Sequence, residues 1–387
     1  MKRLIRVITV LILLLLITGC WNNRDLTDLA VVTGLGIDLS ENQKIELTLQ
    51  VIKPSALRST QDAGHSEEKA YTNITVEGRT LFEAIRNVIT YFDRRAYFAH
   101  VQVIVIGEEL AAKGIGDILD LFERDSETRR RAELIIAKDM KAREILDVKS
   151  ELQAIPSIQL YEGLKTSDDL SKASSINLFE LLKELSHGDH SVLIPVIHCV
   201  GSEARLEDLK VEGMAVIKKN MLIGYVTPEE TRGFMFAKNK LGSTILVLAS
   251  PVDQEKLISI EVTRSEGKIQ ADIKEGKPLL RIEIKTQGNI GEQQDEADLT
   301  GPESMMVLEQ EAESLIREEI EALIKSSQER LRTDIFGFID KIEKNHPREW
   351  KKIHTQWDEL YVNLNVEVKV DFHVRTPGLI KQPATTR

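Results

Sequence analysis

Apolar and polar residues alternate most regularly near the end of the chain, in the segment VNLNVEVKVDFHV at residues 362–374. Every second side chain from Val362 to Val374 is apolar, and the residues between them are polar. A period of two is typical of a strand with one face in the core and one face in solvent. We expect this strand to join a sheet beneath the helix that precedes it.

The longest helical pattern lies just before that strand. Apolar or small residues recur from Leu308 to Ile342 at a mean spacing of about 3.8 residues, longer than the repeat of about 3.5 residues in a left-handed coiled coil. The spacing predicts a helix that packs on a sheet of its own domain rather than on a partner helix. Gly337 is the position where we expect this helix to kink or split.

The first half of the chain alternates between strand and helix patterns. A helix is predicted to begin at Thr80, which stands three residues before Glu83 in a capping-box spacing. The segments AHVQVIVIGEEL, residues 99–110, and SVLIPVIHC, residues 191–199, contain strands that are apolar on both faces. Buried strands separated by helices indicate an α/β layer.

A new unit is expected to begin near Gly201. The segment VEGMAVIKKNMLIGYV, residues 211–226, predicts a hairpin that turns at residues 219–220. The pair Thr227 and Glu230 then has the spacing of a capping box and predicts the start of a helix.

Together these patterns predict a mixed α/β and α+β fold of two or three domains, built of β-sheets with packed helices. The expected divisions are a cleaved leader at residues 1–19, an N-terminal α/β domain at 20–200, a small middle α+β domain at 201–255, and a C-terminal α+β domain with the long helix at 256–387.

The amino terminus has the pattern of a bacterial lipoprotein signal peptide. Basic residues precede an apolar run at residues 7–17, which is shorter than the roughly 20 residues that a transmembrane helix needs. The run ends in Ile-Thr-Gly-Cys, which resembles a lipobox and predicts that Cys20 accepts a diacylglyceryl group and becomes the first residue after cleavage. The alternatives are a signal anchor or an ordinary buried cysteine after a signal.

Charge and cysteine content narrow the possible functions. The chain carries a formal net charge of −11, and removal of residues 1–19 leaves 48 basic against 62 acidic residues. Such an acidic chain argues against nucleic acid as a partner. The second cysteine, Cys199, lies in an apolar stretch and is predicted to be a buried thiol, so a disulfide framework is excluded.

No motif predicts catalysis, a cofactor or a metal centre. His187, Asp189 and His190 in the segment HGDH could seed a metal site on a helix, but the glycine and the surrounding turn pattern favour a polar turn. The G-x-G of TGLGID lacks the third glycine and the following helix of a dinucleotide-binding motif. We therefore expect a protein that is not an enzyme.

Two segments rich in basic residues allow more than one functional interpretation. Residues 129–131 are three arginines that could meet anionic lipid headgroups, although a solvated helix end is the simpler interpretation. In HPREWKKIHTQW, Trp350 and Trp357 are seven residues apart and could share one face of a helix, which favours core packing over a binding site.

Four segments resemble the Ger(x)C spore germination lipoproteins, the C subunits of nutrient germinant receptors. These are GCWNNRDLTDLAVVTGLGID, HVQVIVIGEELA, VEGMAVIKKNMLIGYVTPEETRGF and RTDIFGFIDKIEKNHPREWKKIHTQWDELYVNLNVEVKV, and they occur in the order of the family.

The resemblance implies a three-domain lipoprotein on the outer face of the spore inner membrane. It further implies partnership with the membrane-embedded A and B receptor subunits, and a role in receptor assembly and nutrient-triggered germination. It carries over no catalytic residue, and only Cys20 has an implied role. Alternatives outside this family are a solute-binding lipoprotein of an ABC importer and a structural envelope-assembly lipoprotein.

Overall fold

The computed structural model describes residues 2, 3, 6, 29–54, 56, 69–91, 94–124, 129–148, 153–186, 190–200, 209–296, 299 and 301–376. Cys20, with the leader pattern around it, lies outside these residues, as do His187 and Asp189 of the HGDH segment. Among the described helices, none combines the length and apolar character needed to span a bilayer.

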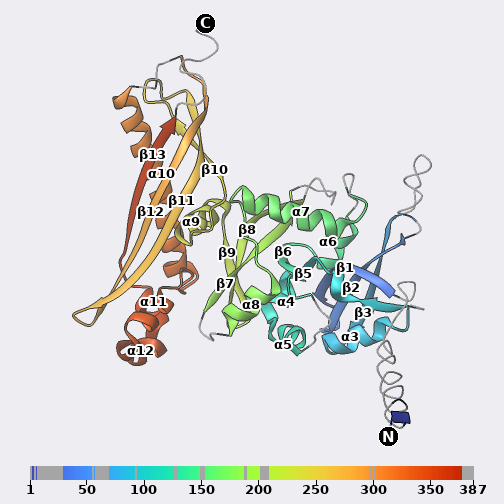
Figure 1. Ribbon diagram of the computed structural model, residues 1–387. Coiled ribbons are helices and arrows are strands. Elements are labelled where there is room, and N and C mark those ends of the chain that lie inside the picture. Colours follow the sequence, from blue (N-terminus) through green and yellow to red (C-terminus); the bar gives the residue numbers. More distant parts are fainter. Residues whose placement is uncertain are drawn as a thin grey trace.

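The described strands form two sheets (Figure 1). The larger sheet has the order β3-β2-β1-β5-β6-β7-β8-β9, with β4 beside β1, and the smaller has the order β10-β11-β12-β13. The strands of the larger sheet are β1 (Leu29–Leu39), β2 (Ile45–Ile52), β3 (Tyr71–Gly78), β4 (Arg95–Tyr97), β5 (Val103–Gly107), β6 (Glu133–Ala137), β7 (Ser191–Cys199), β8 (Leu209–Lys218) and β9 (Met221–Val226). Those of the smaller sheet are β10 (Thr244–Ala249), β11 (Leu257–Lys274), β12 (Lys277–Gln293) and β13 (Val366–Thr376).

The centre of the larger sheet is parallel and covered on both faces. Strands β1, β5, β6 and β7 run in the same direction, and alternate residues of β5 enter two different cores. One core contains α3 (Leu81–Val88), α4 (Glu108–Lys113), α5 (Gly116–Arg124) and α8 (Leu178–Leu185), and the other contains α6 (Ala142–Asp147) and α7 (Pro156–Asp169). This confirms the predicted strand that is apolar on both faces and the α/β layer around it.

The predicted hairpin forms, but it belongs to the first sheet. Lys219 and Asn220 have positive φ angles of 49° and 66°, as a two-residue type I′ turn requires. Strand β8 pairs with β7 in antiparallel fashion, with Ile217 opposite Val192. The larger sheet therefore continues past the boundary expected near Gly201. The smaller sheet likewise crosses the boundary expected between residues 255 and 256, because β10 pairs with β11. A physical reason is that β7 is buried, so its open edge needs a strand to satisfy its backbone groups.

The prediction that Cys199 is buried in the core is wrong. Cys199 is the last residue of β7 and is half-buried rather than enclosed in the core. Burial along β7 is continuous only from Val192 to Ile197. The apolar residues around Cys199 predict the strand correctly. They do not show that the strand leaves the core before its last residue.

The long helical pattern packs on the second sheet and splits. Helix α10 (Pro302–Lys325) buries the predicted stripe, including Leu308, Ile316 and Ile320. It continues into a π-helical turn at Ser326–Arg330, and α11 (Phe338–Asn345) begins after Gly337, whose φ is +72°. The expected split occurs, but the helical run already ends at Arg330, seven residues before Gly337. Gly337, whose positive φ suits glycine, instead marks the start of α11.

Short helices connect α11 to the last strand. They are α12 (Pro347–Ile353), a 3₁₀ turn (His354–Gln356) and α13 (Trp357–Tyr361). The rings of Trp350 and Trp357 meet edge to face with centroids 6.1 Å apart, and Trp357 is buried. This confirms the interpretation of the two tryptophans as core packing.

Strand β13 has the predicted alternation but starts at Val366 rather than at residue 362. Residues 362–364 still belong to the turn after α13, because their N–H groups bond the carbonyl groups of residues 358–361. Within the strand, Val370 and Phe372 are buried, whereas Lys369 and Asp371 are exposed. The strand runs parallel to β12 in the sheet under α10, as predicted.

One helix joins the two sheets. Helix α9 (Pro228–Ala237) directly follows β9 of the larger sheet and packs against α10 and β11 of the smaller unit (Figure 1). Its last turn touches β11 at Gly267, where an added Cβ would lie 1.9 Å from the carbonyl oxygen of Phe236. The Gly267 N–H also donates to the Asn239 side chain at 3.0 Å. The absence of a side chain at Gly267 therefore permits the helix to rest on the strand.

Replacement of Ile320 by alanine should test the packing of α10 on its sheet. Ile320 is fully buried, so the Ile320→Ala protein should lose about 2–5 kcal/mol of unfolding free energy. The exposed neighbour provides a control, since Glu321→Ala should change stability by no more than about 0.5 kcal/mol. Urea unfolding of both variants measures the difference, and equal stability of the two would contradict this packing.

Candidate functional site

The structure places no predicted site residue within its described part, because the only one, Cys20, lies outside it. Of the HGDH segment, His190 is described, and its Nε2 lies 2.9 Å from Asp340 Oδ1 of α11. Among the described residues, no group of three or more histidine, cysteine, aspartate or glutamate side chains is arranged to hold a metal ion.

The best-defined polar cluster lies where β9 passes into α9, and we call it the joint. Glu230 stands at its centre, with only 8% of its surface exposed. Thr227 caps α9 by accepting from the Glu230 N–H at 3.2 Å, and a Glu230 carboxylate oxygen accepts from the Thr227 N–H at 2.9 Å. This is the capping box predicted from the sequence.

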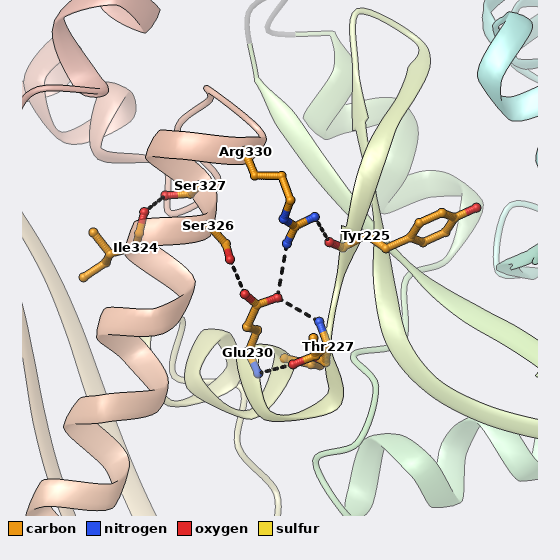
Figure 2. Close-up of polar contacts among 8 residues, drawn as sticks. Tyr225, Thr227, Glu230, Ile324, Ser326, Ser327 and Arg330 are labelled. Atoms are coloured by element: carbon orange, nitrogen blue, oxygen red, sulfur yellow. Dashed lines mark hydrogen bonds and ion pairs between the residues drawn. The ribbon is translucent and has the colours of Figure 1, made fainter.

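The same carboxylate also contacts the carboxyl-terminal end of α10, as Figure 2 shows. The Ser326 hydroxyl donates to Glu230 Oε1, and Arg330 Nη2 lies 3.4 Å from Glu230 Oε2. Arg330 Nη1 donates to the carbonyl oxygen of Tyr225, the last residue but one of β9, at 2.6 Å. One carboxylate and one guanidinium thus connect the first sheet, α9 and α10.

The π-helical turn explains how Ser326 and Arg330 reach the joint. The turn is closed by the Leu331 N–H, which donates to the Ser326 carbonyl at 2.9 Å, a wider loop than in an α-helix. Within it, Ser327 turns the other way and bonds the Ile324 carbonyl and the buried Tyr361 hydroxyl. The turn therefore presents one polar side to Glu230 and anchors the other in the core.

A second row of contacts lies further along the same interface. The Ser191 and Thr333 hydroxyls are 2.7 Å apart, and Lys218 Nζ lies 2.5 Å from Asp358 Oδ2. The hydrogen bond to Asp340 raises the pKa of the His190 imidazole above its usual value. Ionised groups at this interface are therefore held by partners from the opposite unit.

A buried carboxylate organises the chain beside this row. Asp334 accepts from the N–H groups of Phe336, Gly337 and Ile339 at 2.9 to 3.0 Å. Burial raises the pKa of Asp334 to about 6, although these hydrogen bonds act in the opposite direction. Burial also lowers the pKa of the nearby Lys238 ammonium group, which donates to the Phe336 carbonyl.

One hollow borders the joint, and another lies at one end of the larger sheet. A cleft of about 470 Å³ includes Lys138, His198, Tyr225 and Arg330. A smaller one of about 290 Å³ lies at the carboxyl ends of β1, β5 and β6, a common ligand position in α/β sheets. Two of its carboxylates, Asp38 and Glu108, bond other parts of the chain.

Asp38 is buried and Glu108 is half-buried at this end of the sheet. Asp38 accepts from the N–H groups of Ala142 and Arg143 at the start of α6, and burial raises its pKa. Glu108 accepts from the Tyr225 hydroxyl at 2.6 Å. These groups hold helices and strands together, so the arrangement supports a contact role better than a catalytic one.

The sequence signalled part of the joint. Thr227 and Glu230 were detectable by their spacing, but their contact with Ser326 and Arg330 spans about a hundred residues and gives no local pattern. Arg330 carried no signal, because an arginine near the end of a helix is common on solvated surfaces.

Substitutions at Glu230 should measure the strength of the joint. Glu230→Ala removes a buried acceptor and leaves the Thr227 N–H and Arg330 without it, so we expect a loss of about 1–3 kcal/mol. Glu230→Gln keeps a capping side chain and should lose less. Glu229→Ala, at the exposed neighbouring position, is the matched control. Urea unfolding ranks the three variants, and equal stability of Glu230→Ala and Glu229→Ala would refute this role.

The His190–Asp340 pair should make stability depend on pH. The folded-state pKa of His190 is raised above its ordinary value of 6.5. Its contribution is therefore fully present below about pH 6.5 and is lost as the pH rises through the folded-state pKa. Asp340→Asn should destabilise by about 0.5–1 kcal/mol at pH 6 and by less at pH 8.5.

The matched control for that pH dependence is Glu343→Gln, an exposed position on the same helix. Thermal unfolding of the wild type and both variants between pH 6 and pH 8.5 gives the comparison. An Asp340→Asn effect that is constant across this range would contradict the ion pair.

Comparison with known proteins identifies the family. Residues 22–199 match the spore germination protein N-terminal domain, and residues 212–378 match the spore germination B3/GerAC-like C-terminal domain. Spore germination protein KC of Bacillus subtilis (strain 168) is 26% identical over 399 residues, covering 99% of this chain and 98% of the relative. Spore germination protein B3 of the same organism is 26% identical over 377 residues, covering 95% and 96%.

A solved structure gives the same result for the fold. The crystal structure of the GerBC protein superposes with a TM-score of 0.58 at 22% identity, covering 88% of this chain and 96% of that one. The predicted mixed α/β fold is thereby confirmed. With both halves of the chain matched by spore germination models and the relatives aligned over nearly their whole length, the chain belongs to the Ger(x)C family of spore germination proteins.

Proposed function

We propose that this chain is the lipid-anchored C subunit of a spore nutrient germinant receptor. In this role it is a non-enzymatic accessory that the receptor needs for assembly and for nutrient-triggered germination. Its partners are the membrane-embedded A and B subunits, and its place is the outer face of the spore inner membrane. The observation that carries the proposal is the match of both halves of the chain to spore germination models.

The anchor at Cys20 rests on the sequence. The apolar run at residues 7–17 followed by Ile-Thr-Gly-Cys has the form of a lipoprotein signal. Two acyl chains on one cysteine are about what stable anchoring requires, since a single chain binds a membrane only marginally. A protein held in this way needs no transmembrane helix of its own.

The architecture does not favour a solute-binding subunit of an importer. Such a protein would be expected to have two similar doubly wound lobes. The two sheets here differ in size and topology, because the larger has a parallel centre and the smaller has an antiparallel meander with one parallel edge strand.

Replacement of Cys20 tests the anchor and the function together. Cys20→Ala should abolish incorporation of radiolabelled palmitate and slow nutrient-triggered germination in spores. Cys199→Ser, which changes the half-buried cysteine of β7, should keep the label and serve as the control. A Cys20→Ala protein that is labelled and supports normal germination would contradict the anchor.

Assembly is tested separately by affinity capture from detergent-solubilised spore membranes. A tagged chain should retain the membrane-embedded subunits, and the Glu230→Ala variant should retain them less if the joint fixes the geometry that they contact. Titration of the purified chain with amino acids and sugars distinguishes the importer alternative. Tight binding of one solute, without capture of receptor subunits, would overturn the proposed function.

A further inference from the structure

The amino-terminal ends of the parallel strands lie together at one end of the larger sheet. We call this end the tether edge. Leu29, the first residue of β1, pairs with Arg95 of β4 at this edge. Only eight residues lie between Cys20 and Leu29, and the nine Cα-to-Cα steps of an extended chain span at most about 30 Å. If Cys20 carries lipid, as the proposed function holds, the tether edge must stay close to the bilayer.

Exposed arginines lie along the tether edge. Arg94 and Arg95 stand at the start of β4, and residues 129–131 stand just before β6. Strands β1, β5 and β6 are parallel neighbours, with Val103 opposite both Gly34 and Glu133, so the two groups of arginines occur at the same end of the sheet. This concentration of positive charge contrasts with the net charge of −11 of the chain as a whole.

Exposed apolar side chains lie among these arginines. After α3, Ile89 is 54% and Tyr91 is 66% exposed. Phe179, at the start of α8, is 54% exposed, and its N–H donates to the Arg130 carbonyl at 2.9 Å. Aromatic rings beside arginines suit the boundary between lipid headgroups and acyl chains, where both parts of each side chain find a favourable environment.

Acidic side chains on the neighbouring helices do not cancel this charge. Asp120 is paired with Arg124 at 2.9 Å, and Glu123 and Glu180 are exposed near residues 129–131. The five exposed arginines at positions 94, 95 and 129–131 outnumber the exposed carboxylates of Glu123 and Glu180. Glu133, at the start of β6, is half-buried, and burial raises its pKa to about 7.

A second basic surface lies at the same end of the molecule. The start of β7 contacts α11 through His190 and Asp340, and Figure 1 shows α12 at the same lower end of the view as α3 and α5. Helices α11 and α12 carry the exposed basic residues Lys341, Lys344, Arg348, Lys351 and Lys352, against the exposed acidic residues Glu343 and Glu349. The basic character thus extends from the tether edge to the smaller unit.

We infer that the tether edge is the surface with which this protein rests on an anionic lipid bilayer. The arginines meet the negative headgroups, and Tyr91 and Phe179 enter the interface. The acidic remainder of the chain is repelled by the same membrane charge and points away from it. The contact orients the protein, while the acyl anchor supplies the attachment.

Fluorescence quenching in vesicles tests this orientation. The acylated chain, with Cys199→Ser, receives a single fluorescent label at Tyr91→Cys or at the exposed Val247→Cys of β10. Strand β10 lies in the upper part of Figure 1, whereas α3 and α5 lie in the lower part. The vesicles contain equal parts of phosphatidylglycerol and phosphatidylcholine with a nitroxide on the lipid headgroup. The label at 91 should be quenched, and the label at 247 should stay bright.

Charge reversal separates this contact from the anchor. With Arg129→Glu, Arg130→Glu and Arg131→Glu together, or in vesicles of phosphatidylcholine alone, quenching at 91 should fall to the level of 247 while the protein still floats with the vesicles. Reversal of Lys240 and Lys256, which lie near β10, is the control and should leave quenching at 91 unchanged. Thermal unfolding shows whether each variant is folded.

The possible outcomes distinguish the two proposals. Equal quenching at both labels, or quenching at 91 that survives both the arginine reversal and the removal of phosphatidylglycerol, would overturn the membrane-facing edge while leaving the anchor intact. A wild-type protein that does not float with the vesicles would contradict the anchor at Cys20, and the inference would fail with it.

Discussion

The carboxylate of Glu230 accepts from the first turn of its own helix and from side chains 96 and 100 residues further along the chain. It is nearly buried, and a buried charge is stable only where such partners surround it. This group therefore helps to fix the position of the smaller sheet, together with the contacts of Ser191, Lys218 and His190 across the same interface. If α9 moved away from the π-helical turn, Glu230 and Arg330 would each lose their partner, and the end of β9 would lose the guanidinium that bonds Tyr225.

Much of the fold was predictable because the signals that define it are local. The double-sided burial of β5, the alternation in β13 and the start of α11 after Gly337 all follow from residues that are neighbours in sequence. The pairing of β8 with β7 was not predictable in this way, because any edge with free backbone groups could have accepted the hairpin. The joint has the same character, since its capping box is local and its contacts with Ser326 and Arg330 are not. Residues 129–131 were visible as a basic segment, but only the parallel order of the strands places them beside Arg95 and the start of the chain's first strand.

The polar groups of this protein connect chain segments to one another. Asp38 and Glu108, at the sheet end where many α/β proteins bind a ligand, instead hold α6 and Tyr225. Asp334 caps the segment before α11, and His190 meets Asp340 across the interface. These contacts hold the chain in a fixed shape, and the role proposed for it beside membrane-embedded subunits would require such a shape.

The contact between α9 and Gly267 lies part-way along β11, so the strand extends from this contact in both directions, like a beam on a pivot. Strand β11 continues from Gly267 for seven residues to Lys274 and for ten residues back to Leu257, about 23 Å and 33 Å at 3.3 Å per residue. A rotation of a few degrees about this point moves the two ends of the beam in opposite directions by about 1–3 Å, given those arm lengths. A small repacking around one glycine thus becomes a displacement at both ends of the sheet that is large enough to break or form contacts with a neighbouring molecule.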